Sequence, residues 1–402
     1  MHINCANGFP IVDMLNHLPP LPLFIDYYEY TESGASLPDQ DDYELGIYHA
    51  LRLHGRVRHI ELLLPPSILH KVSVLLDGHF PILEHLSLRV SPICKNRLPL
   101  TLPKAFLAPN LRHLVLPSIS PPRRLRVLAS TVSLVTLMLS EIRASSYFRP
   151  RVLVARLSSL PLLEELFIGF YIPIPRPSTE RELLGEQGNT VTLPSLKKLG
   201  FKGVGAYLES LVAQIRAPLL ERLDITLFNQ ISLALPHLSY LINITKAFKF
   251  PIANVNFDRE TVYVTMAGSG WAPSLLRVIC KPLDWQIDGM AQICHGLIPA
   301  LSCVERLTLN HHEEISSELR DGGIDSATWH DLLRSFIGMK ELDIGGNGIS
   351  EELSHALQVD EVGLDPEFLP NLRSIRARRN LFASFIDTRQ VVGRPVQFSW
   401  RP

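Results

Sequence analysis

The sequence predicts an α/β protein of stacked repeats, a curved solenoid with parallel strands on its concave face and helices on its convex face. A six-residue phrase with apolar residues at its first, fourth and sixth positions recurs every 23 to 35 residues or so. Stretches with helical spacing of apolar residues separate the copies. Self-similarity at this period is typical of solenoids, in which each unit packs only on its neighbours.

Each copy of the phrase predicts one short strand. Its fourth and sixth positions alternate with polar neighbours, which indicates a strand with one buried face. The copies begin at Leu83, Leu111, Leu134, Leu163, Leu196, Leu220, Val304, Met339 and Leu372. We therefore expect the leucines at position four to lie side by side in parallel: Leu86, Leu114, Leu137, Leu166 and Leu199.

The segments between the phrases predict helices over 67–76, 206–215, 285–297 and 329–336. Strand, turn, helix and return form the right-handed unit of leucine-rich repeats. Asparagine does not recur after the strands, so we expect an irregular version. Residues 240–282 break the rhythm and predict an inserted β-hairpin or meander around 248–280, with a turn at Asp258-Arg259-Glu260.

We expect one irregular domain over 1–402. It comprises an N-terminal strand and helix cap (1–54), regular repeats (55–240), the β interruption (241–282), and C-terminal repeats with a closing helix and strand (283–402). The polar stretches 172–192 and 310–325 predict surface loops. Whether these loops cover the concave face is left open.

Composition excludes several classes of partner. The 402 residues carry a net charge of −1, so no global field attracts nucleic acid or an anionic membrane. Five cysteines, with no C-x-x-C spacing, indicate buried thiols in a reducing compartment. The N-terminus shows no secretory signal, and no apolar run reaches the roughly 18 residues that span a bilayer. We expect an intracellular monomer, cytoplasmic or nuclear.

Several segments resemble a known family. They are Pro10–Leu15 with Pro19–Leu23, Ala108–Leu114, Leu283-Asp284-Trp285, and Phe385–Gln390 followed by Gly393–Val396. In these the chain resembles the leucine-rich-repeat region of the F-box-type proteins of mushroom-forming (basidiomycete) fungi. The resemblance implies a non-catalytic scaffold that holds a protein partner on its concave face. It also implies the substrate-recognition part of a ubiquitin ligase receptor.

In that family an F-box precedes the repeats and binds a Skp-type adaptor. No segment of that kind is visible before Pro19, and the first strand is expected at Leu23–Tyr27. A Skp-type adaptor is therefore an expected partner only if an F-box lies upstream. Loss of the F-box and a late start of the gene model both remain open.

No catalytic constellation stands out, so we expect no enzyme, no cofactor and no metal site. Gly345-Gly346-Asn347-Gly348 predicts a strand-to-helix turn and lacks the spacing of a nucleotide-binding fingerprint. The cluster 311–314 (His-His-Glu-Glu) lies in a loop, where adjacent residues seldom reach tetrahedral geometry. Two alternatives stay open: a small-molecule binder or enzyme with a pocket near 240–282, and a degenerate family copy with no dedicated ligand.

Positions three and five of the phrase are predicted to project from the concave face, in rows about 4.8 Å apart. Position three reads His59, His85, His113, Thr136, Glu165, Lys198 and Arg222, and position five reads Glu61, Ser87, Val115, Met138, Phe167, Gly200 and Asp224. These rows supply the candidate partner-binding residues: His59, His85, His113, Val115, Met138, Glu165, Phe167, Lys198 and Arg222.

Three features are expected within the rows. The first is a ladder of three stacked imidazoles (His59, His85, His113) that titrate near pH 6.5. The second is an exposed apolar strip formed by residues 115, 138 and 167, and the third is a charged border formed by residues 165, 198 and 222. Solvated histidines without a role, a strip covered by the 172–192 loop, and a metal on the three histidines are the alternatives.

Overall fold

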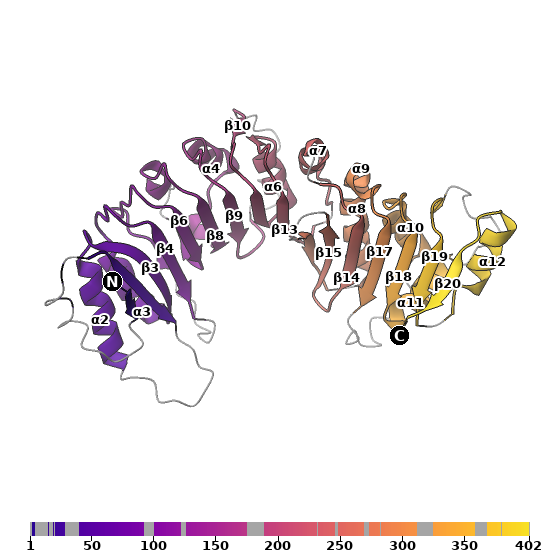
Figure 1. Ribbon diagram of the computed structural model, residues 1–402, viewed down its shortest axis with the longest axis horizontal. Coiled ribbons are helices and arrows are strands. Elements are labelled where there is room, and N and C mark those ends of the chain that lie inside the picture. The colour runs from indigo at the N-terminus through magenta and orange to yellow at the C-terminus, as the bar shows by residue number, and fades with distance from the viewer. Residues whose placement is uncertain are drawn as a thin grey trace. The chain divides into compact units, whose positions relative to one another are not determined.

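A computed structural model describes residues 2–4, 15, 19, 21–28, 40–91, 100–121, 126–174, 189–230, 232–245, 248–268, 273–281, 283–311, 325–357, 368–378 and 380–401. The chain divides into two compact units. The first comprises Met1–Gly203 and Gln214–Leu219, and the second Val204–Ala213 and Leu220–Pro402. Each unit is a mixed α/β structure with its own run of strands in a mostly parallel sheet (Figure 1).

The strands of the first unit run in parallel, in chain order. In the sheet they are β1 (His2–Asn4), β2 (Leu23–Tyr28), β3 (Val57–Leu64), β4 (His85–Val90), β6 (His113–Pro117), β8 (Thr136–Ile142), β9 (Glu165–Phe170) and β11 (Lys198–Gly203). Two short parallel pairs lie apart from this sheet: β5 (Leu100–Thr101) with β7 (Ile119–Ser120), and β10 (Val191–Thr192) with β12 (Ile215–Arg216).

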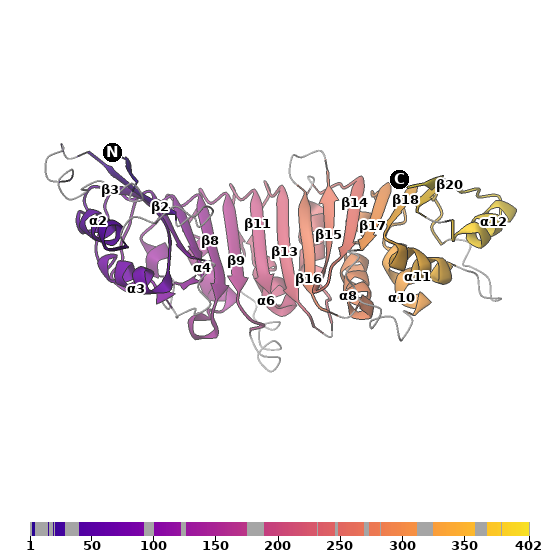
Figure 2. The same ribbon diagram turned by 90° about the horizontal axis from the view of Figure 1, so that it is seen from below.

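Helices cover one side of this sheet. They are α2 (Gln40–Arg52), α3 (Pro66–Leu75) and α4 (Pro150–Leu157), with short 3-10 turns η2 (Arg126–Ala129) and η3 (Ala144–Ser146). Figure 2 shows α2, α3 and α4 on the same side of the strands. A proline begins α3 and α4, at positions whose backbone N–H would have no partner within the helix. The expected helix over 67–76 is confirmed.

The predicted register is confirmed in this unit. Leu86 pairs with Leu114, Leu114 with Leu137, Leu137 with Leu166, and Leu166 with Leu199. All five leucines are at most 1 % exposed. They form a continuous apolar row, and burial of each leucine contributes on the order of 2 kcal/mol of transfer free energy.

Polar side chains link one repeat to the previous one. The donor is the side chain of the residue that directly precedes a six-residue phrase. The acceptor is a backbone carbonyl in the preceding repeat, two residues before the start of its own phrase. Nδ2 of Asn110 donates to Pro81 O at 2.6 Å, and Oγ of Ser195 donates to Pro161 O at 2.9 Å. In the second unit Nδ2 of Asn371 donates to Ile337 O at 2.9 Å. These bonds satisfy carbonyls at the strand entry that no strand pairs.

The second unit has a sheet whose order differs from chain order. Its neighbouring strands are β13 (Arg222–Phe228), β16 (Ser274–Ile279), β15 (Thr261–Ala267), β14 (Ile252–Phe257), β17 (Arg306–His311), β18 (Glu341–Gly345), β19 (Ser374–Ala377) and β20 (Gln397–Trp400). Its helices are α6 (Gly205–Val212), α7 (Pro236–Ile244), α8 (Leu283–Gly296), α9 (Ile298–Leu301), α10 (Ser326–Arg334), α11 (Asn347–Leu357) and α12 (Ala383–Val391).

The predicted β interruption is confirmed as a three-stranded meander that is part of the sheet. Strand β15 is antiparallel to both β14 and β16. Because two reversals restore direction, β16 is parallel to β13 and β14 is parallel to β17. In the sheet, β16 therefore lies next to β13, and β14 lies two strands farther away, next to β17. Helix α8 connects β16 to β17 along the chain.

A buried glutamine ties α8 to the meander. Gln286 is 0 % exposed, and its Nε2 donates to the carbonyls of Asp258 (2.8 Å) and Cys280 (2.9 Å). The first carbonyl belongs to the predicted hairpin turn, and the second follows β16. One side chain thus fixes the start of the helix against one end of the meander, where the β14–β15 turn lies beside the end of β16.

A buried carboxylate plays a similar part at α7. Glu209 in α6 is 3 % exposed and accepts hydrogen bonds from the backbone N–H groups of His237 (2.7 Å) and Leu238 (3.0 Å). These donors lie at the start of α7, which has no side-chain cap of its own. Burial raises the pKa of Glu209, and the two backbone hydrogen bonds and nearby His237 act in the opposite direction.

We expect the Glu209→Gln variant to alter the pH dependence of stability. A raised pKa means that, above its usual value and up to the raised one, the folded state binds more protons than the unfolded state. The contribution of Glu209 to stability therefore falls as pH rises through that range. As the pH is lowered from 7 to 4.5, the free energy of unfolding of the wild type, measured with urea, should therefore increase relative to that of Glu209→Gln. A difference that stays constant with pH would contradict this reading.

The remaining helices agree with expectation, with shifted ends. Helix α6 stops at Val212, before the expected end at 215, because Ile215 pairs in β12. Helix α11 begins at Asn347, close behind the Gly345–Gly346 turn, where Gly346 has a φ of +95°. The C-terminal helix, glycine turn and strand are confirmed as α12, Gly393 and β20.

Several expectations fall outside the described residues: most of the 172–192 loop (175–188), the 310–325 loop beyond His311, and the family-like segment 10–14. The end of the first loop forms β10. The prediction of one domain over 1–402 stays a prediction. Within the described ranges, every helix is too short or too polar to cross a bilayer.

Candidate functional site

The candidate site is the open face of the first unit, which we define as the side of its sheet turned away from α2, α3 and α4. Side chains at positions three and five of the phrase lie on this face. The predicted rows are in register: His59 pairs with His85, His85 with His113, and Ser87 with Val115. The rows continue through β8, β9 and β11, where Met138 pairs with Phe167 and Phe167 with Gly200.

The histidine ladder is confirmed in part. The rings of His59 and His85 stack with centroids 4.2 Å apart and planes at 10°. The ring of His113 lies 5.5 Å from that of His85 and is tilted by 41°. Its Nδ1 is within 3.1 Å of Oγ1 of Thr136, and this hydrogen bond holds the third ring out of the stack. The structure thus contains one stacked pair and one tilted neighbour.

The expected titration near pH 6.5 is wrong for His85. The pKa of His85 is lowered to about 4, first by burial of the ring and second by the neighbouring His59. The pKa of His113 is also lowered, by burial first and then by Arg112. His85 is therefore neutral at physiological pH, with a lone pair on one ring nitrogen.

Two carboxylates flank the histidine pair, and sequence reasoning missed one of them. Strand β2 brings Asp26 into register with Glu61 after a shift between Leu23 and Phe24. Oδ1 of Asp26 lies 3.2 Å, and Oε2 of Glu61 3.7 Å, from Nε2 of His59. The signal available from sequence was the strand Leu23–Tyr27, but its register depends on this irregularity.

The apolar strip is less exposed than predicted. Val115 is only 9 % exposed, and Met138 and Phe167 are half-buried. Ser87, in the same row, is 0 % exposed and accepts a hydrogen bond from Nε of Arg89 at 3.3 Å. Long neighbouring side chains therefore cover this row at its start, and the accessible part of the strip is Met138 with Phe167.

Two glycines, Gly169 and Gly200, leave the space that the ring of Phe167 occupies. A Cβ at Gly200 would collide with Cδ2 of Phe167 and lie only 3.0 Å from Cε2, and a Cβ at Gly169 would lie 2.9 Å from Cε1. The ring therefore lies across the position where the next strand has no side chain. We call Met138, Phe167 and Gly200 the Phe167 platform.

The charged border is confirmed only within the first unit. Nζ of Lys198 lies 3.8 Å from Oε2 of Glu165, and both side chains are at least a third exposed. Arg222 belongs to β13 of the second unit, so it is described separately from this pair. An exposed pair of this kind contributes little to stability, about 0–1 kcal/mol, and remains available to a partner.

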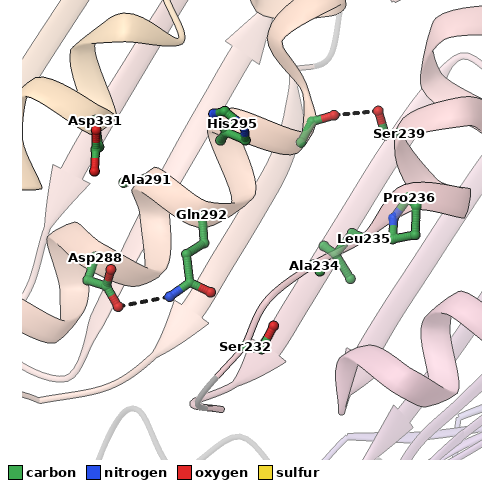
Figure 3. A pocket seen from close by; sticks show the side chains of 11 residues that line it. Ser232, Ala234, Leu235, Pro236, Ser239, Asp288, Ala291, Gln292, His295 and Asp331 are labelled. Carbon is green, nitrogen blue, oxygen red and sulfur yellow. Dashed lines mark hydrogen bonds between the residues drawn. The ribbon is translucent and has the colours of Figure 1, made fainter.

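The second unit has a pocket of about 710 Å³ on its helical side (Figure 3). It lies between α7 and α8, close to α10, and is adjacent in sequence to the β interruption. The side chains that line it come from three elements: Ser232, Ala234, Leu235, Pro236 and Ser239 from the α7 region, Asp288, Ala291, Gln292, His295 and Gly296 from α8, and Asp331 from α10.

The ionisable groups of this pocket do not form a catalytic arrangement. Asp288, His295 and Asp331 are all exposed. Oδ2 of Asp288 accepts a hydrogen bond from Nε2 of Gln292 at 2.9 Å, one turn along the same helix (Figure 3). The hydroxyl of Ser239 donates to Gly296 O, which joins α7 to the end of α8. These are contacts of exposed helix surfaces and do not favour the enzyme alternative.

No family model matches the chain, and no curated protein matches it. The functional argument therefore rests on the open face itself: the histidine–carboxylate group at β2 to β4, the Phe167 platform at β8 to β11, and the Glu165–Lys198 pair beside it.

Proposed function

We propose that this protein is a non-catalytic scaffold that binds a protein partner on the open face of its first unit. The observation that carries the proposal is the Phe167 platform, a half-buried aromatic ring that lies over a glycine and beside the half-buried Met138. Rigid aromatic surfaces edged by polar groups are typical centres of protein interfaces.

The chemistry of the platform defines the partner. An aliphatic or aromatic side chain of the partner packs on Phe167 and Met138. The Glu165–Lys198 pair, on one flank, offers a carboxylate and an ammonium group to polar atoms of the partner. In the same position-three row, on the neighbouring strands, His113 and Thr136 offer hydrogen-bonding groups. This combination fits an extended protein segment of mixed apolar and polar character better than a uniformly charged polymer.

The parallel strands and one-sided helices of the first unit support a leucine-rich-repeat solenoid as the finer description of the fold. On this description the open face is the concave face. The likeness to fungal F-box-type proteins adds that the partner is a protein destined for ubiquitination, with a Skp-type adaptor bound through an F-box. That role is part of the proposal.

The test is a pair of substitutions on the platform. We expect the double variant Met138→Ala/Phe167→Ala to bind a purified partner at least about 30-fold more weakly than the wild type. The reason is that loss of a central aromatic contact costs about 2 kcal/mol or more of binding free energy. The partner is first identified with a photo-crosslinking residue at position 138. Crosslinks that require Phe167 are then confirmed with recombinant proteins by calorimetry.

The matched control is Val74→Ala on the helical side of the same unit, where Val74 is 63 % exposed. This variant should bind the partner as the wild type does. Equal affinity of the platform variant and the wild type for every crosslinked protein would overturn the proposal. Circular dichroism confirms that each variant is folded.

A further inference from the structure

The most concentrated group of metal-ligating side chains in the described ranges lies on the open face, at strands β2 to β4. Ligand atoms of His59, Glu61 and His85 all lie within 4.8 Å of one another. The three residues come from two adjacent parallel strands, in which His59 pairs directly with His85. Side chains fixed on paired strands are held more precisely than side chains on loops.

An orphaned atom points to a missing ligand. Among the residues that the structure describes, Nε2 of His85 is a buried side-chain atom with no hydrogen-bond partner. A buried polar atom without a partner costs free energy, and native structures usually satisfy it. The stacked ring of His59 offers it no donor, because the two rings lie face to face.

The charge of the surroundings also favours a cation. Asp26 and Glu61 bring two carboxylates within 3.2 Å and 3.7 Å of the same ring nitrogen of His59. Arg89 lies beside Glu61, with its Nη2 3.9 Å from Oε1 of Glu61, and its side chain is 48 % exposed. The two carboxylates thus place acceptor oxygens on the side of the His59 ring where a cation would bind.

We propose that His59, Glu61 and His85 bind one divalent transition-metal ion of the Zn²⁺ class. Two imidazoles and one carboxylate are the donors that Zn²⁺, Co²⁺ and Ni²⁺ prefer, whereas Ca²⁺ and Mg²⁺ require oxygen ligands. Donors around tetrahedral Zn²⁺ lie about 3.4 Å apart, since its bonds are about 2.0–2.2 Å long. The His59–Glu61 separation of 3.7 Å is already close to that value.

The remaining adjustment is a rotation of the His85 ring out of the stack, which turns its lone pair toward the ion. Three protein ligands leave the fourth position of a tetrahedral ion to water or to an incoming side chain. Asp26 lies beside His59 and stabilises the positive charge. This inference does not depend on the proposed function, because binding of the ion requires no partner.

The test is a titration of the metal-stripped full chain with Zn²⁺ by calorimetry, and with Co²⁺ by visible absorption. We expect one ion per chain and, for Co²⁺, the intense bands of a four-coordinate site. Glu61→Gln should lower the affinity for Zn²⁺ by at least about tenfold. The double variant His59→Asn/His85→Asn should bind no ion at this site, as expected when ligands are removed.

Two controls separate this site from adventitious surface histidines. His70→Asn alters an exposed histidine on α3, and His311→Asn with His312→Asn alters the other histidine cluster of the chain. Both should bind Zn²⁺ and Co²⁺ as the wild type does. Absence of stoichiometric binding by the wild type, or unchanged binding by the folded Glu61→Gln and His59→Asn/His85→Asn variants, would overturn the proposal.

Discussion

Replacing Trp329 by alanine is expected to lower the free energy of unfolding by about 3–5 kcal/mol, the usual cost of removing a fully buried tryptophan. Trp329 in α10 is 0 % exposed, and its ring meets that of Phe257 edge to face at 5.8 Å between centroids. Phe257 ends β14, so this contact joins a helix to the inserted meander. Urea unfolding followed by tryptophan fluorescence and circular dichroism measures the loss.

The effect arises from packing. Among the residues that the structure describes, Nε1 of Trp329 has no hydrogen-bond partner, so Trp329→Phe should cost much less than Trp329→Ala. The matched control is Trp285→Ala in the same unit, where Trp285 is 57 % exposed and should change stability by less than about 1 kcal/mol. Equal losses in Trp329→Ala and Trp285→Ala would contradict the assigned core.

Replacing Gly200 by alanine is expected to remove the Phe167 platform while leaving the fold intact. The new Cβ would occupy the space of the Phe167 ring, which has to rotate away from the sheet. Such overpacking costs about 1–3 kcal/mol of stability. Binding of the crosslinked partner should fall by about tenfold or more, because the rigid surface is lost although no contact residue has been truncated.

Gly55→Ala provides the matched control, since a Cβ at Gly55 meets nothing within 4 Å. It should leave both stability and partner binding nearly unchanged. A crystal structure of Gly200→Ala shows directly whether the ring has moved. Unchanged ring position together with unchanged partner affinity would show that the glycine does not shape the binding surface.

The parallel register of the first unit was predictable because one periodic pattern fixes it. Leucines at position four bury completely in every repeat, and a slip by one residue would turn them to the open face. The identity of the neighbours along each row, such as His59 beside His85 and Met138 beside Phe167, follows from that single constraint. No structural knowledge beyond the period is needed.

Side-chain conformation and irregular register were beyond the sequence. The pattern does not show that Arg89 covers Ser87, or that Thr136 holds His113 out of the stack, because these depend on rotamers of long or hydrogen-bonded side chains. Asp26 joins the histidine group only through the shift in β2. Alternation around 258–260 predicted a hairpin, but its insertion into the sheet depends on pairings remote in sequence.

The reversed order of the meander has a kinetic consequence. In the first unit neighbouring strands are close in sequence, as in the Leu86–Leu114 pair. In the second unit Asp224 pairs with Leu275 and Val255 with Leu309, at roughly twice that separation. Closing longer loops before any contact is gained slows the search for the native state. The late-forming part of this protein during refolding should therefore be β13 to β17, and hydrogen-exchange labelling would detect its delayed protection.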